Sequence, residues 1–90
     1  MLTLTEKAAQ MIRHLASRAE LPAGAGLRIA QREDHPSLAM SLAVEPEPYD
    51  EVLVEHDSAV FLGPRAARRL ATKTLDAKAD AHGSAFFLRP

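Results

Sequence analysis

The chain has 90 residues, of which 47% are hydrophobic and 26% charged, and this composition is typical of one folded domain spanning residues 1–90. It contains no cysteine, which excludes a disulfide framework, a thiolate zinc site and a cysteine-ligated iron–sulfur cluster held by this chain alone. Its net charge of −1 provides no global field that would attract nucleic acid or an anionic membrane.

The first predicted element is an amphipathic helix over Thr5 to Ala19. Its apolar residues recur at steps of three and four, which places them on one face: Ala8, Ile12, Leu15, Ala16 and Ala19. Thr5 is a suitable N-cap, and Glu6 supplies the acidic residue favoured in a first turn. The segment 21–26, with one proline and two glycines, ends the helix.

Four strands are predicted next, in two pairs. Alternating apolar residues predict strands over 27–31 and 38–44, and the polar loop between them carries His35. The proline-containing segment 45–50 is expected to form a turn. Strands at 52–54 and 60–62, separated by a turn at 56–58, then predict a hairpin.

A second, short helix is predicted to start at Pro64, because proline suits the first helical position. One side of it carries a basic stripe made of Arg65, Arg68, Arg69 and Lys73. Such a stripe could meet phosphates or an acidic partner, but it is interpreted here as a solvated helix face. No aromatic residues lie nearby to stack on bases, and nucleic-acid binding is not expected. A final hairpin is predicted from strands at 74–77 and 85–88 with a turn at 80–84.

The order of these elements, together with several local strings, resembles the HesB/IscA-like family of A-type iron–sulfur carriers. The strings are Leu2-Thr3-Leu4-Thr5, Gly26-Leu27-Arg28-Ile29, Leu75-Asp76 and the ending Phe86 to Pro90. The resemblance implies an α+β fold of compact mixed β-sheets, partly barrel-like, with an N-terminal helix and a second short helix.

The same resemblance shows where the family's chemistry is absent. A cysteine that family members carry in the loop after the first long strand falls at His35, followed here by Pro36 in place of a small flexible residue. Family members also carry a cysteine pair beyond the final strand, whereas this sequence ends at Pro90. The sequence is therefore interpreted as a cysteine-free, C-terminally truncated member. By resemblance, its pathway is iron–sulfur biogenesis and its partners are assembly proteins.

His35, with Asp34 and Glu33 on the same loop, is the candidate metal site. Imidazole and carboxylate ligands suit iron(II) and other borderline divalent metals, and a homodimer would bring two copies of the loop together. The competing interpretation is a solvated turn. The pairs Asp80 with His82 and His56 with Asp57 are better explained as turns, and His14 as a boundary residue of the first helix.

Enzymatic activity is not expected and is kept only as a remote alternative. Glu45 and Glu47 form a carboxylate pair on an exposed turn, and no nucleophile elbow, phosphate loop or dinucleotide fingerprint occurs. No apolar run approaches the roughly 20 residues that span a bilayer, and a cytoplasmic location is expected. Two functions remain: a non-catalytic binding or scaffold module without resident cofactor, and a mononuclear metal-binding protein.

Overall fold

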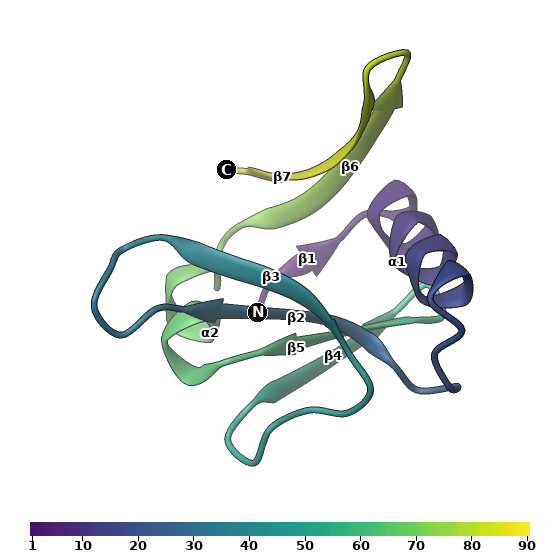
Figure 1. Cartoon of the computed structure of the whole chain (residues 1–90). Helices are drawn as coiled ribbons and strands as arrows, with labels where there is room; N and C mark the ends of the chain where they lie inside the picture. Colours follow the sequence, from purple (N-terminus) through teal and green to yellow (C-terminus); the bar gives the residue numbers. More distant parts are fainter.

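A computed structural model describes all 90 residues and contains two helices and seven strands (Figure 1). In chain order they are β1 (Thr3–Leu4), α1 (Glu6–Arg18), β2 (Gly26–Gln31), β3 (Leu38–Ala43), β4 (Glu51–Glu55), β5 (Ser58–Leu62), α2 (Pro64–Arg69), β6 (Thr74–Asp80) and β7 (Gly83–Arg89).

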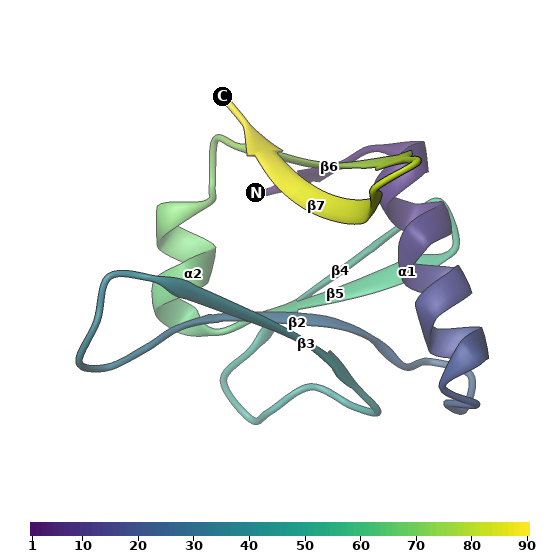
Figure 2. The ribbon, with the colours of Figure 1, turned by 45° about the horizontal axis from the view of Figure 1, so that its top comes forward.

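The strands form two separate sheets. One has four strands in the order β3-β2-β5-β4, with β2 and β5 parallel and the outer pairs antiparallel. The other has three strands in the order β1-β6-β7. Figure 2 shows the two sheets on opposite sides of the core, with α1 and α2 closing its two ends. The expected α+β fold of mixed sheets with two helices is confirmed, and the sheets do not close into a barrel.

The core between the sheets is aliphatic, as the low aromatic content requires. Alternation along β2 buries Leu27 and Ile29 toward the core and turns Arg28 to the opposite face. The helix α1 contributes Ala8, Ala9 and Ile12. Edge strands complete the core only partly, since Leu38 of β3 and Leu88 of β7 pack against it while remaining half-buried.

The start of α1 follows the predicted capping chemistry. The Thr5 hydroxyl accepts a hydrogen bond from the Ala8 N–H at 3.1 Å and donates one to Asp76 Oδ1 at 2.7 Å. One side chain therefore caps the helix and ties it to β6.

The expected element boundaries differ from the structure in three places. The strand β1 was not predicted, because it has only two residues and pairs in parallel with the distant β6. The final hairpin is longer than predicted, with its turn at Ala81-His82 instead of 80–84. Ser58 begins β5 instead of ending a turn, and it is 4% exposed.

A buried serine needs hydrogen-bond partners, and Ser58 has two. Its hydroxyl donates to the Ala9 carbonyl oxygen at 2.8 Å, and Arg13 Nη1 donates to Ser58 Oγ at 3.1 Å.

The hairpin turn between β4 and β5 is formed by His56 and Asp57. Both residues have positive φ, as a two-residue loop between right-twisted strands requires. Neither helix is long and apolar enough to cross a bilayer.

Candidate functional site

The His35 loop joins β2 to β3 and is exposed along its whole length, residues 32–37. The Arg32 N–H donates to the Ser37 carbonyl oxygen at 3.3 Å, which closes the loop at its base. From α2, Arg69 Nη1 donates to the Pro36 carbonyl oxygen. The loop is therefore held at its neck and its side, while its polar side chains face solvent.

The hydrogen bonds of the His35 ring are made by Nδ1. This nitrogen accepts from the Ser37 N–H at 3.2 Å and lies 3.0 Å from Ser37 Oγ. Because Nδ1 accepts, we assign the ring proton of the neutral form to Nε2. A metal could bind Nε2 only after that proton has moved to Nδ1, where it would donate to Ser37 Oγ.

The structure does not gather a complete set of metal ligands within one chain. Glu33 and Asp34 lie on the same exposed loop as His35. No group of three or more His, Cys, Asp or Glu side chains with the spacing of a metal site is present. One chain therefore offers at most part of a coordination sphere, and the assignment of these three residues stays a prediction.

The other histidines have structural surroundings of their own. His56 occupies the hairpin turn between β4 and β5. His82 occupies the turn between β6 and β7, where its backbone N–H donates to Asp80 Oδ1 at 2.8 Å. His14 lies on α1, at the rim of a groove described below.

A buried carboxylate that the sequence did not single out lies near the predicted pair Glu45 and Glu47. Asp50 has a side chain only 1% exposed and accepts from Arg28 Nε at 2.8 Å and Nη2 at 2.9 Å. These hydrogen bonds lower the pKa of Asp50 and raise that of Arg28. Glu47, 65% exposed, lies 3.3 Å from Arg28 Nε. These contacts hold residues 47–50, which precede β4, against Arg28 on the outer face of the four-stranded sheet. Their role is therefore structural.

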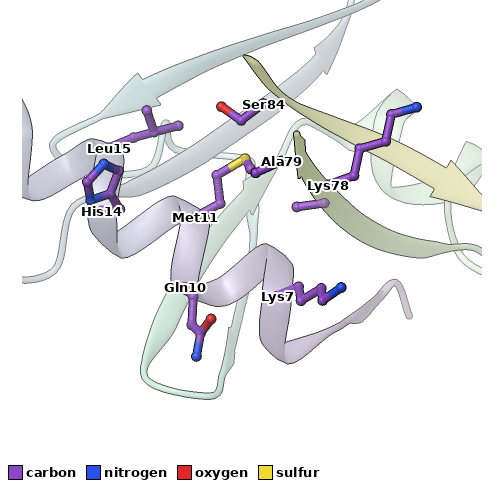
Figure 3. A pocket seen from close by; sticks show the side chains of 9 residues that line it. Lys7, Gln10, Met11, His14, Leu15, Lys78, Ala79 and Ser84 are labelled. Atoms are coloured by element: carbon purple, nitrogen blue, oxygen red, sulfur yellow. The ribbon is translucent and has the colours of Figure 1, made fainter. Parts of the chain in front are cut away.

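The largest hollow is a groove of about 460 Å³ between α1 and the β6–β7 hairpin (Figure 3). Nine residues line it: Lys7, Gln10, Met11, His14, Leu15, Ala77, Lys78, Ala79 and Ser84. In Figure 3 the Met11 side chain reaches from α1 toward Ala79, while the Lys78 side chain extends away from the helix. Sequence patterns within single elements gave no sign of this groove, because it is created by packing a helix against a distant hairpin.

The groove combines apolar and polar lining residues. Its floor is apolar and includes methionine, whose flexible thioether adapts to different partners. Lysine, glutamine and serine lie around it, and no acidic residue lines it.

Comparison with known proteins identified structural neighbours only. No protein-family model and no curated protein matches the chain. Among solved structures, Escherichia coli SufA, involved in biosynthesis of iron–sulfur clusters, superposes with a TM-score of 0.80 at 23% identity, over 98% of this chain and 83% of SufA. IscA with its [2Fe-2S] cluster superposes with a TM-score of 0.72 at 24% identity, over 99% of this chain and 81% of IscA.

A third neighbour is a protein from Aquifex aeolicus, with a TM-score of 0.72 at 20% identity, covering 99% of this chain and 90% of that protein. All three matches span essentially the whole of the present chain. The fold predicted from the sequence resemblance is therefore confirmed: the chain has the fold of the A-type carriers SufA and IscA.

Proposed function

We propose that this chain is a non-catalytic binding module that acts among the proteins of iron–sulfur cluster biogenesis without carrying a cysteine-ligated cluster. One observation carries the proposal: a fold shared with SufA and IscA is built from a sequence that contains no cysteine. Because iron–sulfur clusters are held chiefly by thiolates, the donor set of this chain does not fit a cluster. What the chain shares with SufA and IscA is the fold.

The groove between α1 and the β6–β7 hairpin is the surface we assign to docking. It combines an apolar floor with a polar rim, which is the usual construction of a site that buries an anchoring side chain of a partner. It also lies at the opposite end of the molecule from α2, so docking there leaves the His35 loop uncovered (Figure 2).

Site-specific photo-cross-linking tests this assignment. A photoreactive benzophenone amino acid placed at Gln10, on the groove, is expected to cross-link to iron–sulfur assembly proteins in the native host. The same group at Tyr49, which is 86% exposed and lies outside the groove, serves as the matched control. Ala79→Arg should abolish the Gln10 cross-links, because it fills the groove at an exposed strand position. Identical products from both positions, or products unrelated to iron–sulfur assembly, would refute the proposal.

Self-association is a related prediction, drawn from the unpaired edges of the sheets. The strands β3, β4 and β7 each have one edge without a partner strand, and such edges pair readily with other chains. We expect a homodimer, which light scattering coupled to size-exclusion chromatography would detect. A monomer at micromolar concentration would contradict the expectation and would also remove any metal site shared between two chains.

The second candidate function is mononuclear metal binding at His35. The observation in its favour is the exposure of the loop, which places an imidazole and two carboxylates, from Glu33, Asp34 and His35, at the surface within three consecutive residues. Anaerobic titration with iron(II), monitored by calorimetry, tests for metal binding at His35. Binding that is lost in His35→Ala and kept in His82→Ala, another exposed turn histidine, would support this function. Absence of binding, or equal loss in both variants, would exclude it.

A further inference from the structure

The end of the molecule formed by α2 and the His35 loop carries arginines without carboxylate partners. Arg65, Arg68 and Arg69 are exposed on α2, and Arg32 is exposed at the start of the loop. The three ion pairs of the molecule are formed by Arg28 and Arg89, so none of these four guanidinium groups lies within 4 Å of a carboxylate. The hydrogen bond from Arg69 to the Pro36 carbonyl oxygen joins the two elements into one surface.

Two of these arginines border a hollow of about 300 Å³ on the outer side of β2. Its other lining residues are Arg28, Ala30, Gln31, Glu33, Gly63 and Pro64. The small residues Ala30 and Gly63 leave the space open. The Arg28 guanidinium forms a fixed wall, because Asp50 holds it through two hydrogen bonds. Arg65 and Arg68, which form no ion pair within the chain, therefore outnumber the one acidic lining residue, Glu33, at a preformed hollow.

We infer that this arginine surface binds a segment of a partner protein that is rich in aspartate and glutamate. Guanidinium groups bind carboxylates through paired hydrogen bonds, and here they are not neutralised by acids of the same chain. No aromatic residue lines the hollow to stack on bases, which favours a carboxylate-bearing protein segment over a nucleic acid. A hollow of this volume accommodates an acidic side chain, while the outer arginines meet the residues around it.

This inference stands apart from the iron–sulfur role proposed above, because it rests on charge at α2 and not on the groove or the fold. It predicts affinity for acidic peptides whether or not the groove binds an assembly protein. The two proposals can therefore fail independently.

Fluorescence anisotropy with a labelled octaglutamate peptide tests the inference at about 50 mM salt, where screening is weak. Arg65→Glu/Arg68→Glu is expected to weaken binding by about tenfold or more, since two ion pairs are replaced by repulsion. Arg65→Gln/Arg68→Gln should give an intermediate loss. Both positions are exposed, and circular dichroism confirms that the variants fold.

The matched control is Arg18→Glu/Val52→Glu/Val54→Glu, which makes the same change in net charge at exposed positions on α1 and β4, outside both the hollow and the groove. It should leave peptide affinity within about twofold of the unmodified chain. Equal weakening in the control would show unspecific attraction and overturn the inference. Absence of peptide binding at low salt would also overturn the inference. So would tighter binding of an oligonucleotide of equal charge, if that binding depends on Arg65 and Arg68.

Discussion

At the scale of single residues, Arg28 and Asp50 form the shortest of the three ion pairs in the molecule. Asp50 is almost fully buried, and Arg28 approaches it with two donors at 2.8 and 2.9 Å. Removing Asp50 would delete both hydrogen bonds and leave Arg28, which is 20% exposed, with the exposed Glu47 as its only carboxylate neighbour.

Asp50→Ala is accordingly expected to lower the free energy of unfolding by about 2 kcal/mol, measured by urea denaturation, because it removes two hydrogen bonds between charged groups. Glu47→Ala is the matched control, because it removes the exposed carboxylate beside the same guanidinium and should cost less than about 1 kcal/mol. Equal effects of the two substitutions would show that burial of Asp50 is not the source of the stability.

His35 and Asp50 show which features of single residues can be predicted from the sequence and which cannot. His35 was correctly expected at an exposed bend between two strands, because the strand periodicity on both sides is local information. The role of Asp50 was missed, since its partner Arg28 is 22 positions away and only the folded chain brings the two together.

At the scale of elements, the helix α1 depends on Thr5 for both its start and its attachment to β6. Thr5→Ala removes the cap to the Ala8 N–H and the hydrogen bond to Asp76, and should lower the free energy of unfolding by about 1 to 2 kcal/mol. Thr5→Ser keeps the hydroxyl and should retain most of the stability. Thermal unfolding of the two variants checks this, and a Thr5→Ala midpoint equal to that of Thr5→Ser would contradict it.

Elements with strong local patterns were predicted well, and those that depend on distant pairing were not. The periodicity of α1 and the alternation in β2 and β3 gave these elements nearly at their observed bounds. The strand β1 exists because its backbone bonds to β6, more than 70 residues away, as in the hydrogen bond from the Thr3 N–H to the Lys73 carbonyl oxygen at 3.0 Å. The groove was missed for the same reason, since its two walls, α1 and the hairpin, are far apart in sequence.

At the scale of the whole molecule, two aspartates with lowered pKa values link stability to pH. Arg28 stabilises the charged form of Asp50, and the Thr5 hydroxyl and the Ala77 N–H stabilise that of Asp76. A carboxylate whose pKa is lower in the folded state stabilises the fold above its unfolded pKa. That stability is lost as the pH falls through the folded value.

We therefore expect the urea midpoint to be constant above about pH 5 and to decline as the pH falls below the ordinary carboxyl value near 4. Asp50→Asn should start less stable and decline less steeply over the same range. Parallel declines in the two proteins would show that Asp50 does not contribute to this acid sensitivity.

The central proposal for the whole molecule is that a fold shared with SufA and IscA binds partner proteins without holding an iron–sulfur cluster. Anaerobic reconstitution with iron(II) and sulfide, followed by desalting and measurement of iron, sulfide and visible absorption, tests this claim most directly. The account predicts no stoichiometric iron and sulfide and no absorption of a thiolate-ligated cluster, because the chain has no thiolate. A stable cluster retained in stoichiometric amount would contradict it.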